Sequence, residues 1–341
     1  MSRETMKYLL TIIILLLALT CCTTGADRNR MRAGLDSINE RNRNDQPFTV
    51  SDVRPYVQFF DDHGTPNDRL LAYYLLGRAY HDHGEAPMAL ECYQCAIDYA
   101  DTLSADCDYS QLSRVYGQMA QIFYEQGLYR EQLVAEQQSV NQAWKGKDTL
   151  AALMSYEQEN EAYRNLNMPD SLLYICEHVS QLYRKYGIPH YAARALGYTL
   201  RALVHRKEFD KAKRYMKIYE SESGYFDSLG NIQKGREVYY RIKGLYFLHT
   251  NVLDSAEYYF CKELSNGKDF GNQHSGALGL SELYQIRHQT DSVAKYYKYA
   301  YAMSDSLYAQ KTTKDVERVK AMYDYTRHQE IAHQESQNAT R

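Results

Sequence analysis

Residues that break helices or favour strands are scarce in this chain of 341 residues. It has only 6 Pro and 18 Gly, and Val and Ile are sparse beyond the first twenty residues. Proline interrupts helices and β-branched residues favour strands, whereas residues that favour helix are plentiful here. The composition therefore predicts an all-α protein.

A basic excess and catalytic motifs are missing as well. The formal net charge is -3, so no basic face is expected for nucleic acid. The sequence contains no H-E-x-x-H, G-x-S-x-G, P-loop or G-x-G-x-x-G motif. We expect a protein that is not an enzyme and has no cofactor, no metal and no small-molecule substrate.

Tyrosine, by contrast, is abundant, with 34 residues against 9 Phe and 1 Trp. A tyrosine ring can pack between helices while its hydroxyl reaches water or a carbonyl oxygen. Such rings suit thin, two-layer structures. Exposed rings lining a groove are the functional alternative, and packing is the expected role for most of them.

The first twenty-two residues read as an export signal. Arg3 and Lys7 precede the apolar run YLLTIIILLLALT, which is followed by Cys21 and Cys22. The run is shorter than the roughly 20 residues that span a bilayer and suits the hydrophobic region of a secretory signal. The ending Leu19-Thr20-Cys21-Cys22 resembles a bacterial lipobox, which implies lipidation with palmitate at Cys22, or at Cys21.

Two alternatives remain for this segment, and both hold the N-terminus at a membrane. A lipoprotein signal over residues 1–22 would be removed, leaving residues 23–30 as a polar tether. An uncleaved anchor is the other possibility. The expected location is the bacterial cell envelope, facing the periplasm.

An internal repeat is clearest between Leu70 and Ala100, in LLAYYLLGRAYHDHGEAPMALECYQCAIDYA. With Leu70 as position 1, its residue types match the tetratricopeptide motif. Small residues at Gly77 and Ala89 would let two helices approach closely, and Tyr93 would fill the neighbouring space. Gly84 is placed to end the first helix, and Pro87 to open the second.

Five weaker units follow, giving about six helical hairpins between residues 70 and 304. Their turns recur every 37 to 44 residues, against 34 in the standard motif, which predicts longer helices or loops. The expected turn residues are Gly84, Gly127, Asn167, Lys207, Asn251 and His288.

Helices are also expected at both ends of this array. Residues 31–69 should form N-terminal capping helices, with Ser51 as a helix N-cap and Pro55 near the start of the second helix. Residues 305–341 read as a long C-terminal helix and tail. The expected fold is therefore a tetratricopeptide-like α-solenoid with capping helices.

Together, the anchor, the segment from Val53 to Ala100 and the tail DVERVKAMYDYTR resemble tetratricopeptide-repeat lipoproteins of Bacteroidetes. The resemblance covers nearly all of the chain. It implies a non-catalytic, membrane-anchored scaffold that binds a protein or peptide. Longer similar proteins continue into a membrane span and an output region, so the alternative is the sensory, periplasmic half of a signalling protein.

Cysteine and histidine pairs in this sequence favour structural roles. Cys92 and Cys95 form a lone C-x-x-C within a predicted helix, where packing is expected and a disulfide to Cys107 is possible. Cys176 and Cys261 read as buried thiols. The segments ending at His63 and at His83 read as helix C-termini rather than metal ligands.

The first helix of each hairpin should line an inner groove. Arginines are frequent at its inner positions, which predicts local positive potential for carboxylates or an acidic peptide, interrupted by Glu157 and Glu161. Internally paired, solvated arginines are the alternative. The candidate groove residues are Tyr74, Arg78, His81, Arg114, Gln121, Tyr124, Arg164, Arg194, Arg201 and Arg241.

Overall fold

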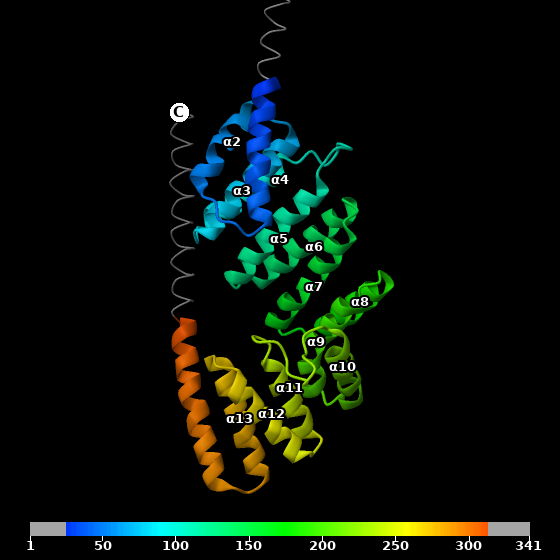
Figure 1. The fold of residues 1–341 in the computed structure, drawn as a ribbon, viewed down its shortest axis with the longest axis vertical. Coiled ribbons are helices and arrows are strands. Elements are labelled where there is room, and N and C mark those ends of the chain that lie inside the picture. Colours follow the sequence, from blue (N-terminus) through cyan, green and yellow to red (C-terminus); the bar gives the residue numbers. More distant parts are fainter. Residues whose placement is uncertain (1–24, 313–341) are drawn as a thin grey trace, which may run out of the picture. The chain divides into compact units, whose positions relative to one another are not determined.

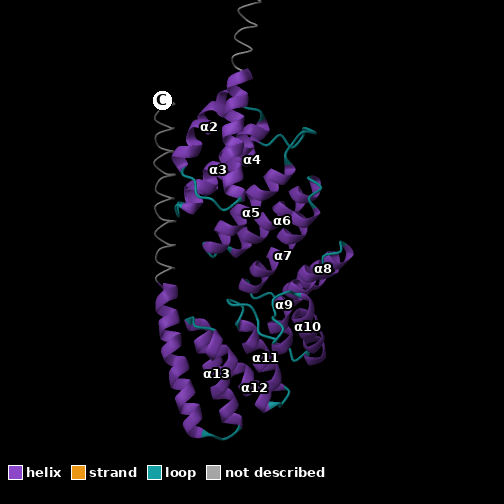
Figure 2. Ribbon diagram, viewed as in Figure 1, coloured by secondary structure: helices purple, strands orange, loops and turns teal. Residues whose placement is uncertain are grey.

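A computed structural model describes residues 25–312 of the chain. Within this range the regular structure is helical, apart from one isolated bridge between Phe226 and Ile232 (Figure 1, Figure 2). The described residues form two compact units, 25–152 and 153–312, with the boundary inside helix α7. The all-α prediction is confirmed. Cys21, Cys22, the predicted signal and the tail beyond residue 312 lie outside the described residues.

The first unit starts with a helix over residues 25–43, which has no label in Figure 1, and α2 (Val50–His63). Two hairpins follow. They consist of α3 (Pro66–Asp82) with α4 (Ala86–Tyr99), and of α5 (Tyr109–Glu125) with α6 (Tyr129–Lys145).

The second unit contains four more hairpins. Buried Tyr183 of α8 donates a hydrogen bond to Glu157 of α7, which pairs these two helices. The helices are α7 (Thr149–Asn165), α8 (Pro169–Lys185), α9 (Pro189–His205), α10 (Phe209–Glu222), α11 (Val238–His249), α12 (Leu253–Asn266), α13 (Phe270–Ile286) and a last helix over residues 290–312. From α3 onward the described residues thus form the predicted six hairpins.

A regular spacing explains the stretched repeat. Helices α5 to α9 are each 17 residues long and are joined by short turns. Each helix from α6 to α10 begins 20 residues after the one before it. The excess over the standard motif therefore lies in longer helices from α5 to α9 and in longer loops at residues 100–108 and 223–237, so both predicted alternatives occur.

The six predicted turn residues all adopt positive φ angles, from 55° at Asn167 to 78° at Gly84. This left-handed conformation ends a helix and turns the chain into the next one. Glycine adopts it without steric cost, and asparagine tolerates it better than most residues. Lys207 adopts it at φ 60° although lysine has no such preference, so the hairpin packing must hold this turn.

Close helix contacts recur within the hairpins, as predicted for Gly77. A Cβ added there would lie 2.4 Å from the ring of Tyr93, which is fully buried. The same relation joins Gly244 to Phe260 at 2.6 Å. A glycine on the first helix thus receives a ring from the second helix, which explains why the motif needs both residue types.

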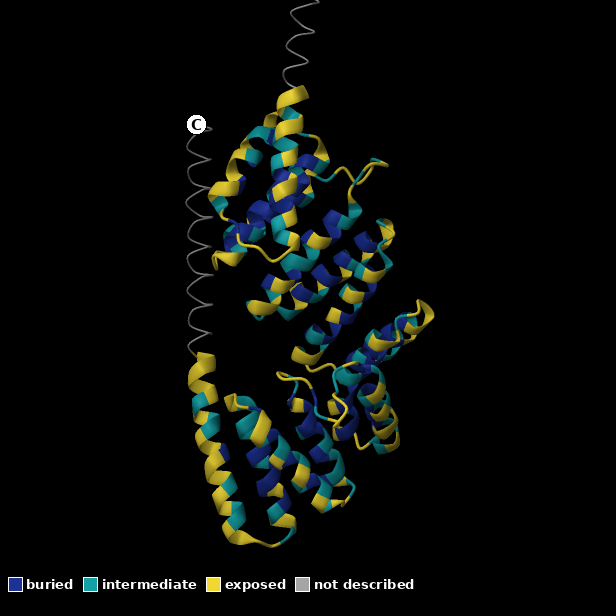
Figure 3. Cartoon of the chain, in the orientation of Figure 1, coloured by how far each residue is buried: buried dark blue, intermediate teal, exposed yellow. Residues whose placement is uncertain are grey.

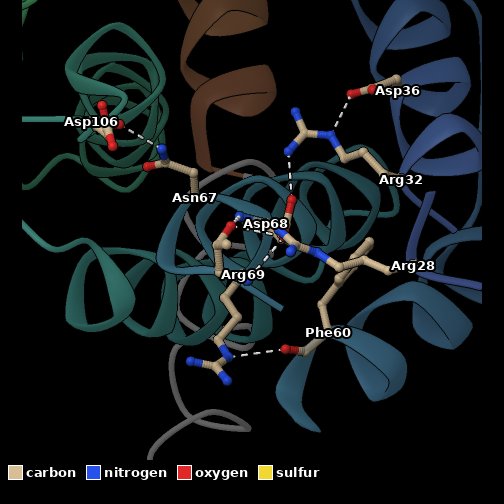
Figure 4. A network of polar contacts seen from close by, with 9 residues as sticks. Arg28, Arg32, Asp36, Phe60, Asn67, Asp68, Arg69 and Asp106 are labelled. Atoms are coloured by element: carbon tan, nitrogen blue, oxygen red, sulfur yellow. Dashed lines mark hydrogen bonds and ion pairs between the residues drawn. The ribbon is translucent and has the colours of Figure 1, made fainter. Parts of the chain in front are cut away.

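The N-terminal helix is fixed to the first hairpin by an ionic network (Figure 4). Asp68, buried in the first turn of α3, accepts hydrogen bonds from Arg28 at 2.7 Å and Arg32 at 2.6 Å. It also accepts from the backbone N–H of Thr65, which closes a capping box. These contacts hold the pKa of Asp68 at about 2, despite burial that opposes the charge.

Several predicted boundaries need correction. Residues 25–30 belong to the helix over residues 25–43 and not to a tether. The hydrogen bond from Arg28 to Asp68 fixes this part of the helix to α3. The N-cap of α2 is Thr49 rather than Ser51, and the repeats begin at Pro66 rather than Leu70. The last described helix runs through residue 305 without interruption, as the second helix of the sixth hairpin.

Candidate binding surface

In the first unit, most of the predicted groove residues are engaged within the protein. Arg78 donates to Asn42 of the N-terminal helix and pairs with Asp82 at 3.2 Å. The prediction that Tyr74 lines the groove is wrong, because Tyr74 is buried and its ring centre lies 6.2 Å from that of Tyr93. The N-terminal helix covers this face of α3, which explains why an inner position became part of the core.

The other candidates of this unit lie on α3 and α5. His81 lies 3.0 Å from Glu125, and Gln121 donates to the same carboxylate at 2.7 Å. Tyr124 is partly exposed, whereas Arg114 is exposed and has no ion pair or hydrogen bond with another described residue. On α3 and α5, the charges of most predicted groove residues are therefore neutralised by neighbouring side chains of the protein.

In the second unit, Arg194 is also engaged, by a segment that the sequence analysis did not single out. Residues 223–237 form a loop between α10 and α11, and Ser223 accepts a hydrogen bond from Arg194 at 2.9 Å. The ring of Tyr225 lies 4.3 Å from the Arg194 guanidinium and 3.6 Å from that of Arg236. Such cation–π contacts hold the loop against the N-terminal half of α9.

Arg241 of α11 supports the structure rather than an open surface. It is half-buried and donates to the carbonyl of Ser275 in α13 at 2.8 Å. Burial lowers its pKa, and the nearby charge of Arg201 lowers it further, although Glu263 and Glu282 act in the opposite direction. Arg241 thus adds positive potential beside Arg201.

Arg201 remains open at the C-terminal half of α9. It is exposed, and within residues 25–312 it has no hydrogen bond or ion pair. One turn later, burial lowers the pKa of His205, helped by the charges of Arg201, Arg241 and His249. His205 therefore lies near several positive charges, whereas the charge of Arg241 is partly balanced by Glu263 and Glu282.

A cleft of about 610 Å³ adjoins this region. Its walls come from the end of α7, the turn into α8, the first turn of α8 and the C-terminal half of α9. Arg164, Arg201 and Arg206 line it, and its lining includes no carboxylate. Arg164 pairs with Glu161 and Arg206 pairs with Asp170, so Arg201 is the least compensated of the three.

Glu157 and Glu161, which were expected to interrupt the positive potential of the groove, reduce it less than predicted. Glu157 is buried, and burial raises its pKa to about 7 while the Tyr183 hydroxyl donates to it at 2.8 Å. A carboxyl of this kind is partly protonated at neutral pH. The carboxylate of Glu161 forms an ion pair with Arg164.

Buried Glu263 is a second carboxyl that the sequence analysis did not single out. Burial raises its pKa to about 8, and Ser275 donates to it at 2.5 Å. It lies on α12, between helices, and so bears on stability rather than on the cleft.

The cysteines among the described residues form no disulfide. Cys92, Cys95, Cys107, Cys176 and Cys261 are all free thiols. Burial raises the pKa of Cys92 to about 12, which opposes thiolate formation. Cys261 is exposed, which corrects its predicted burial, whereas Cys176 is buried as predicted.

His63 and His83 make hydrogen bonds at the ends of helices. His83 Nδ1 donates to the carbonyl of Ala79 at 2.8 Å, and His63 Nδ1 donates to that of Phe59 at 3.3 Å, so both serve helix C-termini. Within residues 25–312, no group of three or more His, Cys, Asp or Glu side chains could hold a metal ion. In the same range, no helix has the length and apolarity needed to cross a membrane.

Comparison with solved structures supports the architecture. The apo form of RapI superposes with a TM-score of 0.53 at 10% identity, over 82% of this chain and 99% of that chain. Together with the six helical hairpins of the described residues, this superposition gives a tetratricopeptide-like solenoid. This confirms the fold predicted from the repeat between Leu70 and Ala100.

Two further solved structures align with lower TM-scores. Tetratricopeptide-like repeats of a kinesin light chain from Podosopora anserina align at a TM-score of 0.43 and 16% identity, over 56% of this chain and 93% of that chain. Aspartyl phosphate phosphatase F from Bacillus subtilis aligns at 0.49 and 12% identity, over 81% and 68%. No protein-family profile and no curated protein matches the sequence.

Proposed function

We propose that this protein is a non-catalytic scaffold that binds a protein or peptide on the surface formed by α9 and α11 of the second unit. The observation that carries the proposal is Arg201, which is exposed, lines the cleft and has no ion pair or hydrogen bond within residues 25–312. Elsewhere on the predicted groove, Arg78 and Arg194 are engaged by the protein itself, whereas Arg114 of the first unit is exposed and has no ion pair with another described residue. Exposed, unpaired positive charge next to a cleft supports recognition of an acidic partner.

The tetratricopeptide-like architecture supports the same function, because stacked hairpins expose extended surfaces suited to binding. A fold alone does not establish a function, so the proposal depends on the charge of the surface.

We further propose that the chain is anchored in the bacterial cell envelope through a lipid on Cys22. The support is the apolar run from Tyr8 to Thr20, followed at once by two cysteines. A short lipidated N-terminus would tether the scaffold at a membrane surface while leaving the helical units in solvent.

Affinity capture tests the binding function. The full-length chain, tagged at its C-terminus, is purified from detergent-solubilised membranes of its own organism, and co-purifying proteins are quantified. A partner should be recovered with the unaltered chain and with Arg114→Glu, and lost with Arg201→Glu. Arg114 is the matched control, because it too is exposed and unpaired but lies in the first unit. Equal recovery with both variants would contradict the proposal.

A further inference from the structure

The cleft beside Arg201 combines charge with an apolar wall. Met168 and Pro169, from the turn into α8, line it together with Leu172, and Met168 is 44% exposed. Tyr163 and Tyr198 add ring surface from α7 and α9. A ligand in this cleft can therefore place an apolar side chain against Met168 and an anionic group near Arg201.

The loop over residues 223–237 leaves this part of α9 open. It engages Arg194 in the second turn of α9, whereas Arg201 and His205 lie about two and three turns further along the helix. The chain thus occupies one half of the α9 surface itself and exposes the other half. Of the inner arginines of this helix, only Arg201 can meet a ligand without displacing the loop.

We infer that the cleft formed by α7, α8 and α9 binds an extended peptide segment through a carboxylate held by Arg201, with a neighbouring apolar side chain packed on Met168 and Leu172. A guanidinium recognises a carboxylate through paired N–H donors. The size of the cleft falls within the range of small-ligand sites and suits a few residues of peptide. This inference depends on the proposed scaffold function and specifies its ligand.

Two pairs of synthetic peptides test the inference with the purified full-length chain in detergent, at low ionic strength. The first pair is acetyl-Ala-Ala-Ala-Leu-Leu with a free terminal carboxylate or with an amide. The second is amidated acetyl-Ala-Leu-Glu-Leu-Ala, or the same peptide with Gln in place of Glu. Calorimetry should show a carboxylate peptide binding at least about ten-fold tighter than its neutral partner. The pair that discriminates tells whether a chain end or an acidic side chain supplies the carboxylate.

Three variants complete the test. Arg201→Gln should weaken binding of the carboxylate peptide about ten-fold, and Met168→Glu should abolish it by placing a negative charge on the apolar wall. Arg114→Gln should leave binding unchanged. Because Arg201 and Met168 are exposed, both variants should keep the melting temperature of the unaltered chain.

Equal affinity within both peptide pairs, an absence of binding, or full binding by Arg201→Gln would overturn the inference. The scaffold function is judged separately by affinity capture. A partner that is captured through Arg201 while neither peptide pair discriminates would disprove only the peptide-carboxylate site.

Discussion

Arg32 and Asp68 lie 36 residues apart in the sequence, and their side chains meet with Nη1 of Arg32 2.6 Å from Oδ1 of Asp68. Arg28 binds the other carboxylate oxygen at 2.7 Å. A helix expected only to cap the array is thereby fixed to the first hairpin, and its residue Asn42 reaches Tyr74 and Arg78. This contact removes part of the predicted groove from solvent.

Asp68→Asn should destabilise the first unit by about 2 kcal/mol at pH 7, because the pKa of Asp68 is about 2 in the folded protein against 3.8 ordinarily. A lowered carboxyl pKa stabilises the fold above pH 3.8, and this contribution is lost as the pH falls towards 2. Urea unfolding at pH 7 and at low pH measures it. Asp36→Asn is the control, since Asp36 pairs with Arg32 at the surface and should contribute well under 1 kcal/mol. Equal effects of the two variants would contradict the role of Asp68.

Gly77→Ala should destabilise the protein by about 1–3 kcal/mol, because the new methyl group would meet the buried ring of Tyr93. Gly117→Ala is a matched control in the next hairpin, where the nearest side-chain atom is the Ser139 Oγ at 3.7 Å. It should stabilise the protein by about 0.5–1 kcal/mol through helix propensity. Denaturant midpoints of the two variants should thus move in opposite directions, and shifts of the same sign would refute the close contact at Gly77.

Glu157→Gln should stabilise the second unit at alkaline pH and change little at pH 4.5. Burial raises the pKa of Glu157 from 4.5 to about 7, so the folded protein holds the proton more tightly than the unfolded chain. The cost of ionising Glu157 is absent below pH 4.5, grows as the pH rises and is complete above pH 7. The stability difference between variant and unaltered chain should therefore increase by roughly 3 kcal/mol over that window. A difference independent of pH would show that Glu157 is not titrating there.

Cys22→Ala should abolish incorporation of a clickable palmitate analogue when the full chain is expressed in a bacterial host. Cys21→Ala should retain it, since Leu19 stands three residues before Cys22, as a lipobox requires. In-gel fluorescence after labelling provides the measurement. Labelling lost only in Cys21→Ala would move the lipid by one residue, and unlabelled protein in every case would favour an uncleaved anchor.

The hairpins could be predicted from sequence because their signals are local. Each turn between paired helices requires a residue with a positive φ angle. The backbone has a positive φ at all six expected turn positions, from Gly84 to His288. The pairing of Gly77 with Tyr93 follows likewise from a motif in which both residue types are required. The regular 20-residue spacing from α5 to α10 is visible only when the helix boundaries are known.

The candidate surface was less predictable, because the engagement of an arginine depends on residues distant in the sequence. Arg78 is bound by Asn42 and Arg194 by the loop at Ser223, and neither contact has a local signal. The three glycines at 224, 230 and 235 mark this loop, yet they do not reveal which face it covers. Figure 3 shows the resulting mixture of buried and exposed residues along the helices of each unit.

His205 and Arg206 were not among the predicted groove residues. Both lie at the end of α9, beyond the motif positions used to select inner residues. The cleft lies where the C-terminal end of α9 meets the turn between α7 and α8.

Site-specific photocrosslinking tests the central claim that the α9 surface binds a partner. A photoreactive amino acid replaces Ala202, which lines the cleft, or Lys213, which is exposed on α10, in the full-length chain in its own cells. We expect a discrete crosslinked protein or peptide at position 202, lost when Arg201→Glu is added, and none at position 213. No crosslink at 202, or the same crosslinks at both positions, would contradict it.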